Sequence, residues 1–332
     1  MKTAVVILNY NTRAYLKRFL PGLLASCEGQ DAQVWVADNH SADGSADLLR
    51  EEFPDVPLLP LEQNYGFTGG YNRALAQIEA QYYVLINSDI EVPAGWLAPL
   101  TDWMDTHPDC GACGPKLLRF DQRDTFEYAG AAGGRLDSYG YPFCRGRILQ
   151  KIEKDHGQYD TPANVLWVSG ACLLVRSSVW KALGGLDERF FAHMEEIDLC
   201  WRMQLAGWKV TLVPQSHVYH IGGGTLPNES PFKLRLNFRN NLLLLENNLP
   251  ATFKARGVLH PRRKAWWRIR ARMLLDGCSV LVFLLKGKWR FAAAVWTAHR
   301  EYRRLRRPGE IPANPTLPEG LHNGWIVPKG LF

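Results

Sequence analysis

Residues 83–90 read YVLINSDI, and this short stretch decides the fold. An apolar run predicts a short buried strand, and Asn87, Ser88 and Asp89 follow at its carboxyl end. In an open α/β sheet, ligands bind outside the carboxyl ends of the strands. A carboxylate and an amide at this place can hold a ribose and a divalent cation on a diphosphate. A plain turn is the alternative, because Asn and Asp are also common turn residues.

Apolar runs and amphipathic stretches alternate around this segment. The predicted strands cover residues 3–10, 34–39, 56–64 and 82–89, and the predicted helices cover about 12–25, 46–53 and 71–80. Pro21 suggests a kink or break in the first helix, and Ser45 is the expected cap of the second. This alternation predicts a doubly wound, mostly parallel sheet with right-handed crossovers.

The second half of the chain has a different pattern. Residues 110–150 show no clear period and predict loops and short strands. The later elements are a long strand or strand pair at 164–176, helices at 177–185 (with Ser177 as cap) and 190–207, and a strand at 208–214. Residues 308–332 are rich in Pro and Gly and predict an extended tail.

Length and composition bound the class of protein. The chain has 332 residues, 46% hydrophobic and 22% charged, which is ordinary for a globular protein. The first residues do not have the pattern of a signal peptide, and no apolar run is long enough for a transmembrane helix. Seven cysteines without an export signal predict free thiols in the cytoplasm. Cys110 and Cys113 form a lone C-x-x-C, which favours packing over zinc binding.

The net charge of +6 is concentrated between residues 254 and 307. Arg and Lys clusters alternate there with aromatic and aliphatic runs, which predicts that residues 260–307 lie on the cytoplasmic face of a membrane. A helical pair that covers the core of the protein is the alternative. Nucleic-acid binding through Trp266 and Trp267 ranks well below the membrane role.

Polar residues follow four successive predicted strands. They are Asn9-Tyr10-Asn11, Asp38-Asn39, the loop at Asn64, and Asn87-Ser88-Asp89. Because the carboxyl ends of parallel strands converge on one edge, we expect these residues to meet in one crevice. Four separate turn caps are the alternative.

Two further groups carry ionisable side chains. Glu195, Glu196 and Asp198 lie among apolar residues at a predicted helix start, where burial can raise a carboxyl pKa and suit it to act as a general base. Acidic residues also decorate many helix starts for electrostatic reasons alone. His217 and His220 precede a glycine run and are candidate ligands for a Mn²⁺-like metal, or plain core histidines.

The chain resembles inverting glycosyltransferases of family 2, which have the GT-A fold. The resemblance rests on VVILNYN, VADNHSADGS, NYGFTGGYN, LINSD, GACLLVRSSVWKALGGLDERFF, EEIDLCWR and HVYHIGGG, in the family's order over residues 3 to about 225. It is greatest to bacterial rhamnosyltransferase-like enzymes of surface polysaccharide assembly, including lipopolysaccharide. It implies single transfer from a nucleoside diphosphate sugar to a glycan or lipid-linked acceptor, with Mn²⁺ or Mg²⁺. No Q-x-x-R-W box of processive synthases is present.

The resemblance also implies roles for residues. Asp38 contacts the nucleotide base, and the loop from Asn64 through Gly69 to Asn72 closes over the nucleotide. The metal motif is reduced to Asn87-Ser88-Asp89, so Asp89 is the remaining carboxylate ligand and His220 a second ligand. Glu196 takes the place of the family's usual Asp as general base, with Glu195 and Asp198 as neighbours. Trp167, Gly170 and Arg202 are candidates for the sugar and acceptor pockets.

These implications define three segments. A GT-A domain covers residues 1–230, with a nucleotide-binding half to about 100 and an acceptor half after it. A helical basic segment covers 231–307 and the extended tail 308–332. The expected location is peripheral, on the inner face of the cell membrane, without nucleic-acid partners. The alternatives are a nucleotide-sugar-binding protein without turnover and a nucleotidyltransferase, although the latter would want a glycine-rich phosphate loop near the N-terminus.

Overall fold

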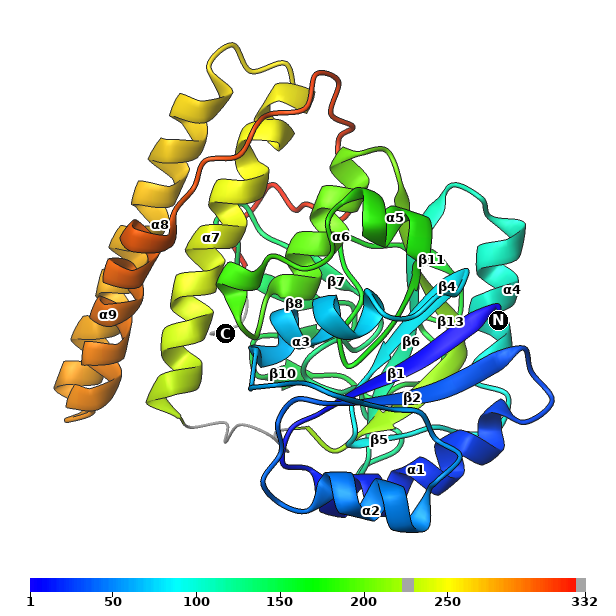
Figure 1. The fold of residues 1–332 in the computed structure, drawn as a ribbon. Helices are drawn as coiled ribbons and strands as arrows, with labels where there is room; N and C mark the ends of the chain where they lie inside the picture. The colour runs from blue at the N-terminus through cyan, green and yellow to red at the C-terminus, as the bar shows by residue number, and fades with distance from the viewer. Residues whose placement is uncertain (223–229, 327–332) are drawn as a thin grey trace.

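The computed structural model describes residues 1–222 and 230–326, and a mixed sheet lies at its centre (Figure 1). Among these residues the sheet has nine strands in the order β11-β13-β6-β12-β4-β1-β2-β3, with β5 paired to β13. The strands are β1 (Thr3–Asn9), β2 (Ala32–Asp38), β3 (Leu58–Pro60), β4 (Tyr82–Ile86), β5 (Ile90–Glu91), β6 (Cys110–Arg119), β11 (Ala163–Asn164), β12 (Cys172–Arg176) and β13 (Lys209–His220). The neighbouring strands β3, β2, β1 and β4 are parallel to one another, and β6 is parallel to β13. Strand β12 runs antiparallel to both of its neighbours, β4 and β6. The predicted fold class, a doubly wound and mostly parallel sheet, is confirmed.

Helices cover both faces of the sheet because its strands are apolar on both sides. Along β1, Val5 and Ile7 pack into one core, whereas Ala4 and Val6 pack into the other. The first core includes helices α1 (Arg13–Cys27), α2 (Ser45–Glu52) and α4 (Ala98–Thr106). The second includes α3 (Gly66–Leu75), α5 (Ser177–Ala182) and α6 (Glu195–Leu205). Each fully buried aliphatic side chain stabilises such a core by about 1.5–3 kcal/mol.

A small antiparallel sheet extends the second half of the chain. Its strands are β7 (Gly134–Leu136), β8 (Pro142–Cys144), β9 (Arg147–Ile148) and β10 (Lys151–Ile152), in the order β10-β9-β8-β7. The outer edge of β7 pairs with Trp167 at Gly134 and with the late segment 320–326 at Leu136. The Leu136 N–H donates to the Gly320 carbonyl at 3.3 Å, and the His322 N–H donates to the Leu136 carbonyl at 2.7 Å. The tail has no helix in this part, but it is packed onto the protein.

Three long helices follow the sheet: α7 (Pro231–Ala255), α8 (Pro261–Leu285) and α9 (Trp289–Leu305). They pack against one another, with α7 between the sheet domain and the α8–α9 hairpin (Figure 1). Leu242 and Leu245 of α7 belong to the same apolar core as Leu199 of α6. No helix in the described ranges combines the length and the apolar character that are needed to cross a membrane.

Several local predictions were wrong. Residues 110–119 form the ten-residue strand β6. The sequence shows no strand period there because nearly every side chain of this strand is buried. The helix expected at 71–80 lies at 66–75, and the helix expected from residue 190 starts at Glu195. The strand expected to end at residue 214 continues to His220, so both histidines lie in β13. Residues 223–225 of the glycine run lie outside the described residues.

The expected caps also differ. Ser45 is the first residue of α2, and its N–H donates to Asp43 Oδ1 at 3.1 Å, so Asp43 caps this helix. Ser177 is likewise inside α5 and makes no capping bond. The helix α1 continues through Pro21. All seven cysteines are free, and Cys110 and Cys113 are buried as packing residues.

Candidate active site

The carboxyl ends of β1 and β2 and the turn after β4 carry a connected set of polar side chains. Asn9 Nδ2 donates to Asp38 Oδ1 at 2.7 Å and to Ser41 Oγ at 2.9 Å. The Ser41 N–H donates to Asp38 Oδ2 at 3.0 Å. Ser88 Oγ donates to Thr12 Oγ1 at 2.8 Å, and the Thr12 hydroxyl donates to Asn9 Oδ1. The strand ends therefore meet at one edge of the sheet, as predicted. Ser41 and Thr12 were not predicted as site residues, although Ser41 lies within the quoted segment VADNHSADGS.

A second set of bonds shapes the turn before α3. Asn39 Nδ2 donates to Asn64 Oδ1 and to the Gly66 carbonyl, both at 3.0 Å. Asn39 Oδ1 accepts the Tyr65 N–H at 3.0 Å. Gly66 has a φ of +70°, and a Cβ there would lie 2.4 Å from the ring of Phe191, so only glycine fits. Asn64 thus holds the turn that brings α3 to the same edge of the sheet.

The other predicted donor-site residues lie around this edge. Tyr10 is half-buried, and Asn11 has a φ of 54° and accepts the Ala42 N–H at 2.8 Å. Asn87 is also half-buried. A Cβ on Gly69 would lie 2.9 Å from the Cβ of Tyr65, so the absence of a side chain lets α3 pack closely on its own first turn.

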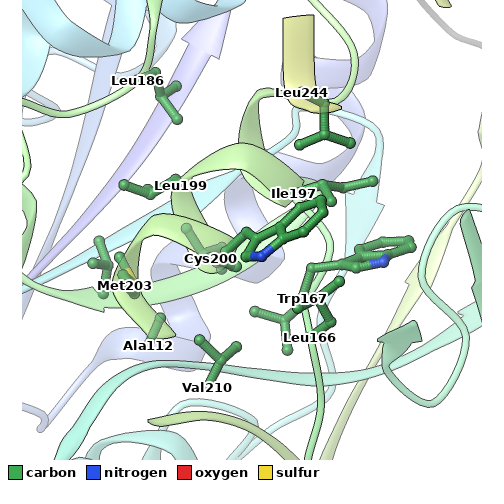
Figure 2. Packing of buried hydrophobic residues seen from close by; sticks show 14 of the residues in the cluster. Ala112, Leu166, Trp167, Leu186, Ile197, Leu199, Cys200, Met203, Val210 and Leu244 are labelled. Carbon is green, nitrogen blue, oxygen red and sulfur yellow. The ribbon is translucent and has the colours of Figure 1, made fainter. Parts of the chain in front are cut away.

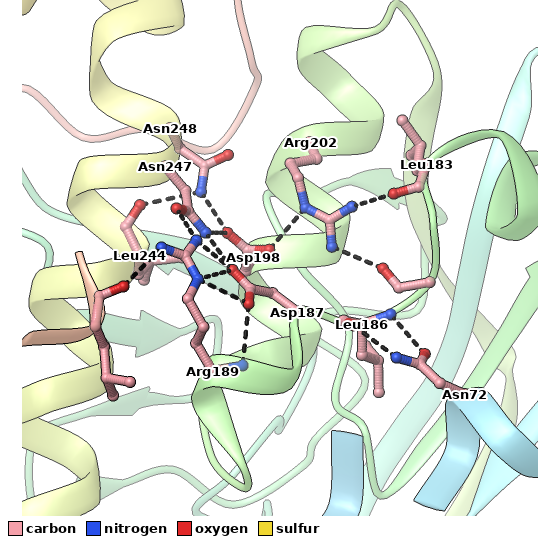
Figure 3. Close-up of polar contacts among 12 residues, drawn as sticks. Asn72, Leu183, Leu186, Asp187, Arg189, Asp198, Arg202, Leu244, Asn247 and Asn248 are labelled. Carbon is pink, nitrogen blue, oxygen red and sulfur yellow. Dashed lines mark hydrogen bonds and ion pairs between the residues drawn. The ribbon is translucent and has the colours of Figure 1, made fainter. Parts of the chain in front are cut away.

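Asn72 has a different position from the one expected (Figure 3). Its Nδ2 donates to the Leu186 carbonyl at 2.8 Å, and its Oδ1 accepts the Leu186 N–H at 2.9 Å. Both ends of the amide are used to brace the turn before η1 (Glu188–Phe190). This geometry favours a structural role for Asn72 over contact with a nucleotide.

Asp89 and His220 come together, although they lie far apart in sequence. His220 Nε2 lies 3.2 Å from Asp89 Oδ1, and both side chains are nearly buried. Two adjacent ligands of an octahedral cation with bonds of about 2.1 Å are separated by about 3.0 Å, so this pair fits one divalent cation. On the other side, His220 Nδ1 lies 3.6 Å from Glu127 Oε1. This separation is longer than a hydrogen bond, and Nδ1 is buried without a hydrogen-bond partner, so Glu127 acts on the imidazole through its charge.

The charge of this pair follows from its surroundings. Burial alone would lower the pKa of His220, but Asp89 and Glu127 raise it to about 10. The imidazole is thus protonated and held between two carboxylates, and a cation would have to displace that proton. Among the residues described, no group of three or more His, Cys, Asp or Glu side chains is arranged to hold a metal ion. Glu127 was missed by the sequence, because it lies in the stretch without a period.

Glu195 and Glu196 open helix α6. Burial raises the pKa of Glu195 well above its usual value, and the neighbouring Glu196 raises it further. Burial raises the pKa of Glu196 to about 7. Glu195 Oε2 is buried without a hydrogen-bond partner, whereas Glu196 keeps partial access to solvent. A carboxyl poised near neutrality can exchange a proton with a substrate, and Glu196 is the more accessible of the two.

Gly170 links this carboxylate to the sheet edge. A Cβ on Gly170 would lie 3.4 Å from the Cβ of Glu196, so the Glu196 side chain begins next to the Gly170 backbone. The next residue, Ala171, accepts the Asn87 N–H on its carbonyl at 2.9 Å. Residues 170–171 thus join the start of α6 to the turn that carries Asp89.

Asp198 and Arg202 belong to a buried network (Figure 3). Asp198 is fully buried; its Oδ2 accepts Arg202 Nε at 2.7 Å, and its Oδ1 accepts Asn247 Nδ2 at 2.9 Å and Asn248 Nδ2 at 2.8 Å. Arg202 also donates to the carbonyls of Leu183 at 2.9 Å and Gly185 at 2.8 Å. These contacts favour a structural role for both residues, against the expectation that they act in catalysis or in the sugar pocket.

Trp167 lies in the apolar core (Figure 2). It is 3% exposed, and its Nε1 donates to the Arg135 carbonyl at 3.3 Å. Its ring lies against Gly134, where a Cβ would come within 1.9 Å. Because it is buried, Trp167 can shape a sugar or acceptor pocket only by supporting the residues that line it.

Comparison with known families gives one match of more than half the chain. The sequence model described as "Glycosyl transferase family 2" matches residues 4–183. This range contains the strand ends at Asn9, Asp38 and Asp89, and it ends before α6.

Similar proteins cover more of the chain. An N-acetylglucosaminyl-diphospho-decaprenol L-rhamnosyltransferase of Mycobacterium tuberculosis is 28% identical over 83% of this chain and 90% of that protein. Rhamnosyltransferase WbbL of Escherichia coli is 26% identical over 65% of this chain and 82% of that protein. The structure of a mannosyltransferase from Pyrobaculum calidifontis, solved with GDP-Man and Mn²⁺, superposes with a TM-score of 0.55 at 14% identity. It covers 92% of this chain and 88% of that one, which shows a shared fold.

Proposed function

The chain belongs to glycosyl transferase family 2, and from this membership we propose that it moves a single sugar from a nucleoside diphosphate sugar to a lipid-linked or glycan acceptor. The process it is proposed to serve is the synthesis of a cell-surface polysaccharide, which is supported by its similarity to rhamnosyltransferases and to an O-antigen biosynthesis protein of Myxococcus xanthus. The observation that supports this most directly is the link through residues 170–171. It brings Glu196, whose carboxyl is poised near neutrality, to the turn that carries Asp89.

The donor is assigned to the edge formed by the ends of β1, β2 and β4. Asp38 is held by Asn9 and Ser41, so its carboxylate has a fixed direction from which to contact the nucleotide base. Thr12 and Ser88 extend this bonded set toward Asp89. The preformed network lowers the cost of ordering the site when the donor binds.

The residues present fit a divalent cation, Mn²⁺ or Mg²⁺. Asp89 and His220 would hold it, with the Glu127 carboxylate 3.6 Å from the other nitrogen of the imidazole. When bound, such an ion supplies positive charge to the departing diphosphate. Because the protein offers only this pair of ligands among the described residues, the donor's phosphate oxygens and water are expected to complete the shell.

Glu196 is the proposed general base of an inverting single displacement. Its carboxylate accepts the proton of the acceptor hydroxyl while that oxygen bonds to the anomeric carbon of the donor sugar. The bond from the anomeric carbon to the diphosphate breaks in the same step, and the nucleoside diphosphate leaves. A positioned base of this kind contributes about a hundredfold to ten-thousandfold in rate.

The acceptor is proposed to be lipid-linked, and the α8–α9 hairpin is proposed to lie on the membrane that holds it. The inner face of α8 is buried through Ala265, Ile269 and Asp276. The opposite face carries Trp267, Leu274, Leu281 and Leu285, at spacings of seven and four residues. Leu274 is 76% exposed and Leu285 is 88% exposed, so this apolar face has no cover within the described residues.

Charge on the same hairpin suits an anionic lipid surface. Arg263 and Arg270 are exposed on α8, and Lys286 and Lys288 flank the turn to α9. The Trp289 side chain at that turn is 68% exposed and suits the headgroup boundary. A peripheral position on the inner face of the cell membrane follows as part of the proposal, with each basic residue contributing about 1 kcal/mol.

The function is tested with the purified protein and a panel of nucleoside diphosphate sugars. The panel pairs uridine, thymidine and guanosine diphosphates with hexoses and with L-rhamnose. The matching donor is expected to raise the unfolding temperature only when Mn²⁺ is present. Mass spectrometry then follows transfer to a polyprenyl-diphosphate N-acetylglucosamine. Donor binding without transfer to this or any glycan acceptor, and without hydrolysis, would contradict the proposed activity.

A further inference from the structure

The segment between η1 and α6 has an unusual backbone. Phe191, His193 and Met194 all lie in the left-handed region, with φ values of 63°, 72° and 75°. Residues other than glycine rarely adopt this conformation, so contacts from outside the segment must hold it in place. Glu195 and Glu196 follow directly, and the direction in which they enter the site depends on this backbone.

One side chain of helix α7 makes three of these outside contacts. The Nδ2 atom of Asn240 lies within hydrogen-bond distance of three carbonyl oxygens of the segment: Phe190 at 2.9 Å, Ala192 at 2.7 Å and His193 at 2.7 Å. Asn240 is fully buried, so water does not compete for these bonds.

Two further residues, Arg239 and Phe67, also hold this segment in place. Arg239 Nε donates to Asn240 Oδ1 at 2.9 Å, which fixes the orientation of the amide, and Arg239 Nη2 donates to the Phe190 carbonyl at 2.7 Å. On the opposite side, the Phe191 carbonyl accepts the Phe67 N–H of α3 at 2.7 Å. The segment is therefore held between α7 and α3.

We propose that Asn240 is a positioning residue for sugar transfer, which acts by fixing the backbone that carries Glu196 toward the acceptor. This inference rests on the proposed role of Glu196 as general base. A displacement of about 1 Å at a reacting group can cost a hundredfold in rate, and loss of the Asn240 amide removes the side-chain donor that holds the Ala192 and His193 carbonyls. The helical segment after the sheet thus contributes to catalysis, although it lies outside the part that matches the family.

The next residue offers a matched control. Asn241 lies on the same helix and is equally buried. Its Nδ2 donates to the Gly140 carbonyl, and its Oδ1 accepts Arg272 Nη1 at 2.6 Å. It therefore also clamps a loop, but that loop carries no candidate catalytic group.

The test compares Asn240→Ala with Asn241→Ala, each alone and combined with Glu196→Gln. In the otherwise unchanged protein, Asn240→Ala is expected to lower kcat at least tenfold and to leave the KM for the donor within twofold. Asn241→Ala is expected to leave kcat within twofold, although both variants lose stability. In the Glu196→Gln background, Asn240→Ala is expected to have no further effect, because the group that it positions is already absent.

Two results would overturn the inference: an unchanged kcat in Asn240→Ala, or an equal fold loss of kcat with and without Glu196. If Asn240→Ala does not fold, Asn240→Ser keeps one donor and serves in its place, with an expected intermediate loss. Normal transfer by Glu196→Gln alone would refute the base assignment itself. Normal transfer by Asn240→Ala beside an inactive Glu196→Gln would refute only the positioning role.

Discussion

His220 Nε2 lies 3.2 Å from Asp89 Oδ1 because strand β13 pairs with β5 immediately after the turn that carries Asp89. In that pairing His220 is opposite Ile90, the residue that follows Asp89. The long strand β13 thus brings the second half of the chain to the donor edge of the first half. The proposed cation site depends on this one register.

Asp89→Ala is expected to abolish Mn²⁺-dependent donor binding, because it removes the carboxylate of a two-residue ligand set. Titration calorimetry with the donor, with and without Mn²⁺, measures the effect. Asp121→Ala removes an exposed carboxylate paired with Arg119 and serves as the control. Mn²⁺-dependent affinity at the level of the unchanged protein in Asp89→Ala would refute the site.

Glu196→Gln is expected to bind the donor normally and to lose transfer by about a hundredfold or more, the usual size of a general-base contribution. Single-turnover rates at saturating donor measure this loss. Glu195→Gln is the matched comparison, since it changes the adjacent carboxyl of the same turn. If Glu195→Gln loses transfer while Glu196→Gln is normal, the base is Glu195.

The pH dependence of transfer is expected to follow the pKa of Glu196, which burial raises to about 7. A base must be deprotonated to accept a proton, so kcat/KM should rise with pH and level off above about pH 7. The groups near this carboxyl include Glu195 and Cys200 of the same helix and Cys144 of β8. A profile that is flat across neutral pH would contradict the assignment.

Stability should depend on pH in the opposite sense. The raised pKa values of Glu195 and Glu196 mean that the folded state retains protons which the unfolded state has released. Their contribution is complete below the usual carboxyl pKa of about 4.3, and the part from Glu196 is lost as pH rises through about 7. The part from Glu195 is lost as pH rises through its own raised pKa. Glu195→Gln should therefore raise the unfolding temperature at alkaline pH. A lower unfolding temperature there would show that the Glu195 carboxylate stabilises the fold.

Asp198→Ala is expected to lower the free energy of unfolding by about 3–5 kcal/mol, because it leaves Arg202 without its buried counter-ion. Urea denaturation followed by circular dichroism measures the loss. Arg50→Ala breaks an exposed ion pair with Asp47 and should change stability by less than about 0.5 kcal/mol. A loss of similar size in both variants would refute the structural role of Asp198.

The exposed face of α8 is expected to bind anionic liposomes at low salt and to release them at high salt. Cosedimentation measures the bound fraction. Leu274→Glu and Leu281→Glu introduce charge into the apolar stripe and should reduce binding at least tenfold, without loss of transfer to a soluble acceptor. Absence of liposome binding by the folded, unchanged protein at low salt would refute the membrane proposal.

The first half of the fold could be predicted because its strands are apolar runs separated by amphipathic helices. β6 could not, because its sequence, CGACGPKLLR, has few residues of high strand propensity. It is a strand because β12 and β13 pair with it on either side and helices cover it, which is information from distant parts of the chain. The start of α6 was misplaced for a similar reason, since bonds from Asn240 of another helix hold residues 192 and 193 outside α6.

For the site, the sequence predicted which side chains are present more reliably than it predicted what each side chain does. Asp89 and His220 were predicted as partners, and the structure brings them together. Asp198 has the right chemistry for catalysis, but its partners Asn247 and Asn248 lie on another helix and bury it. No pattern around Asp198 itself distinguishes it from Glu196.

The segment that covers the edge of β7 has a consequence for the order of assembly. Residues 320–326 are synthesised after all three long helices, yet they complete the backbone pairing of Leu136 and contribute the Ile326 N–H to Asp137 Oδ2 at 3.1 Å. On the ribosome, every strand of the large sheet emerges before the three long helices and this segment. The edge of β7, by contrast, stays unpaired at Leu136 until the late segment arrives. Nascent protein would therefore pass through a state in which all strands of the large sheet are available while the small sheet is still incomplete.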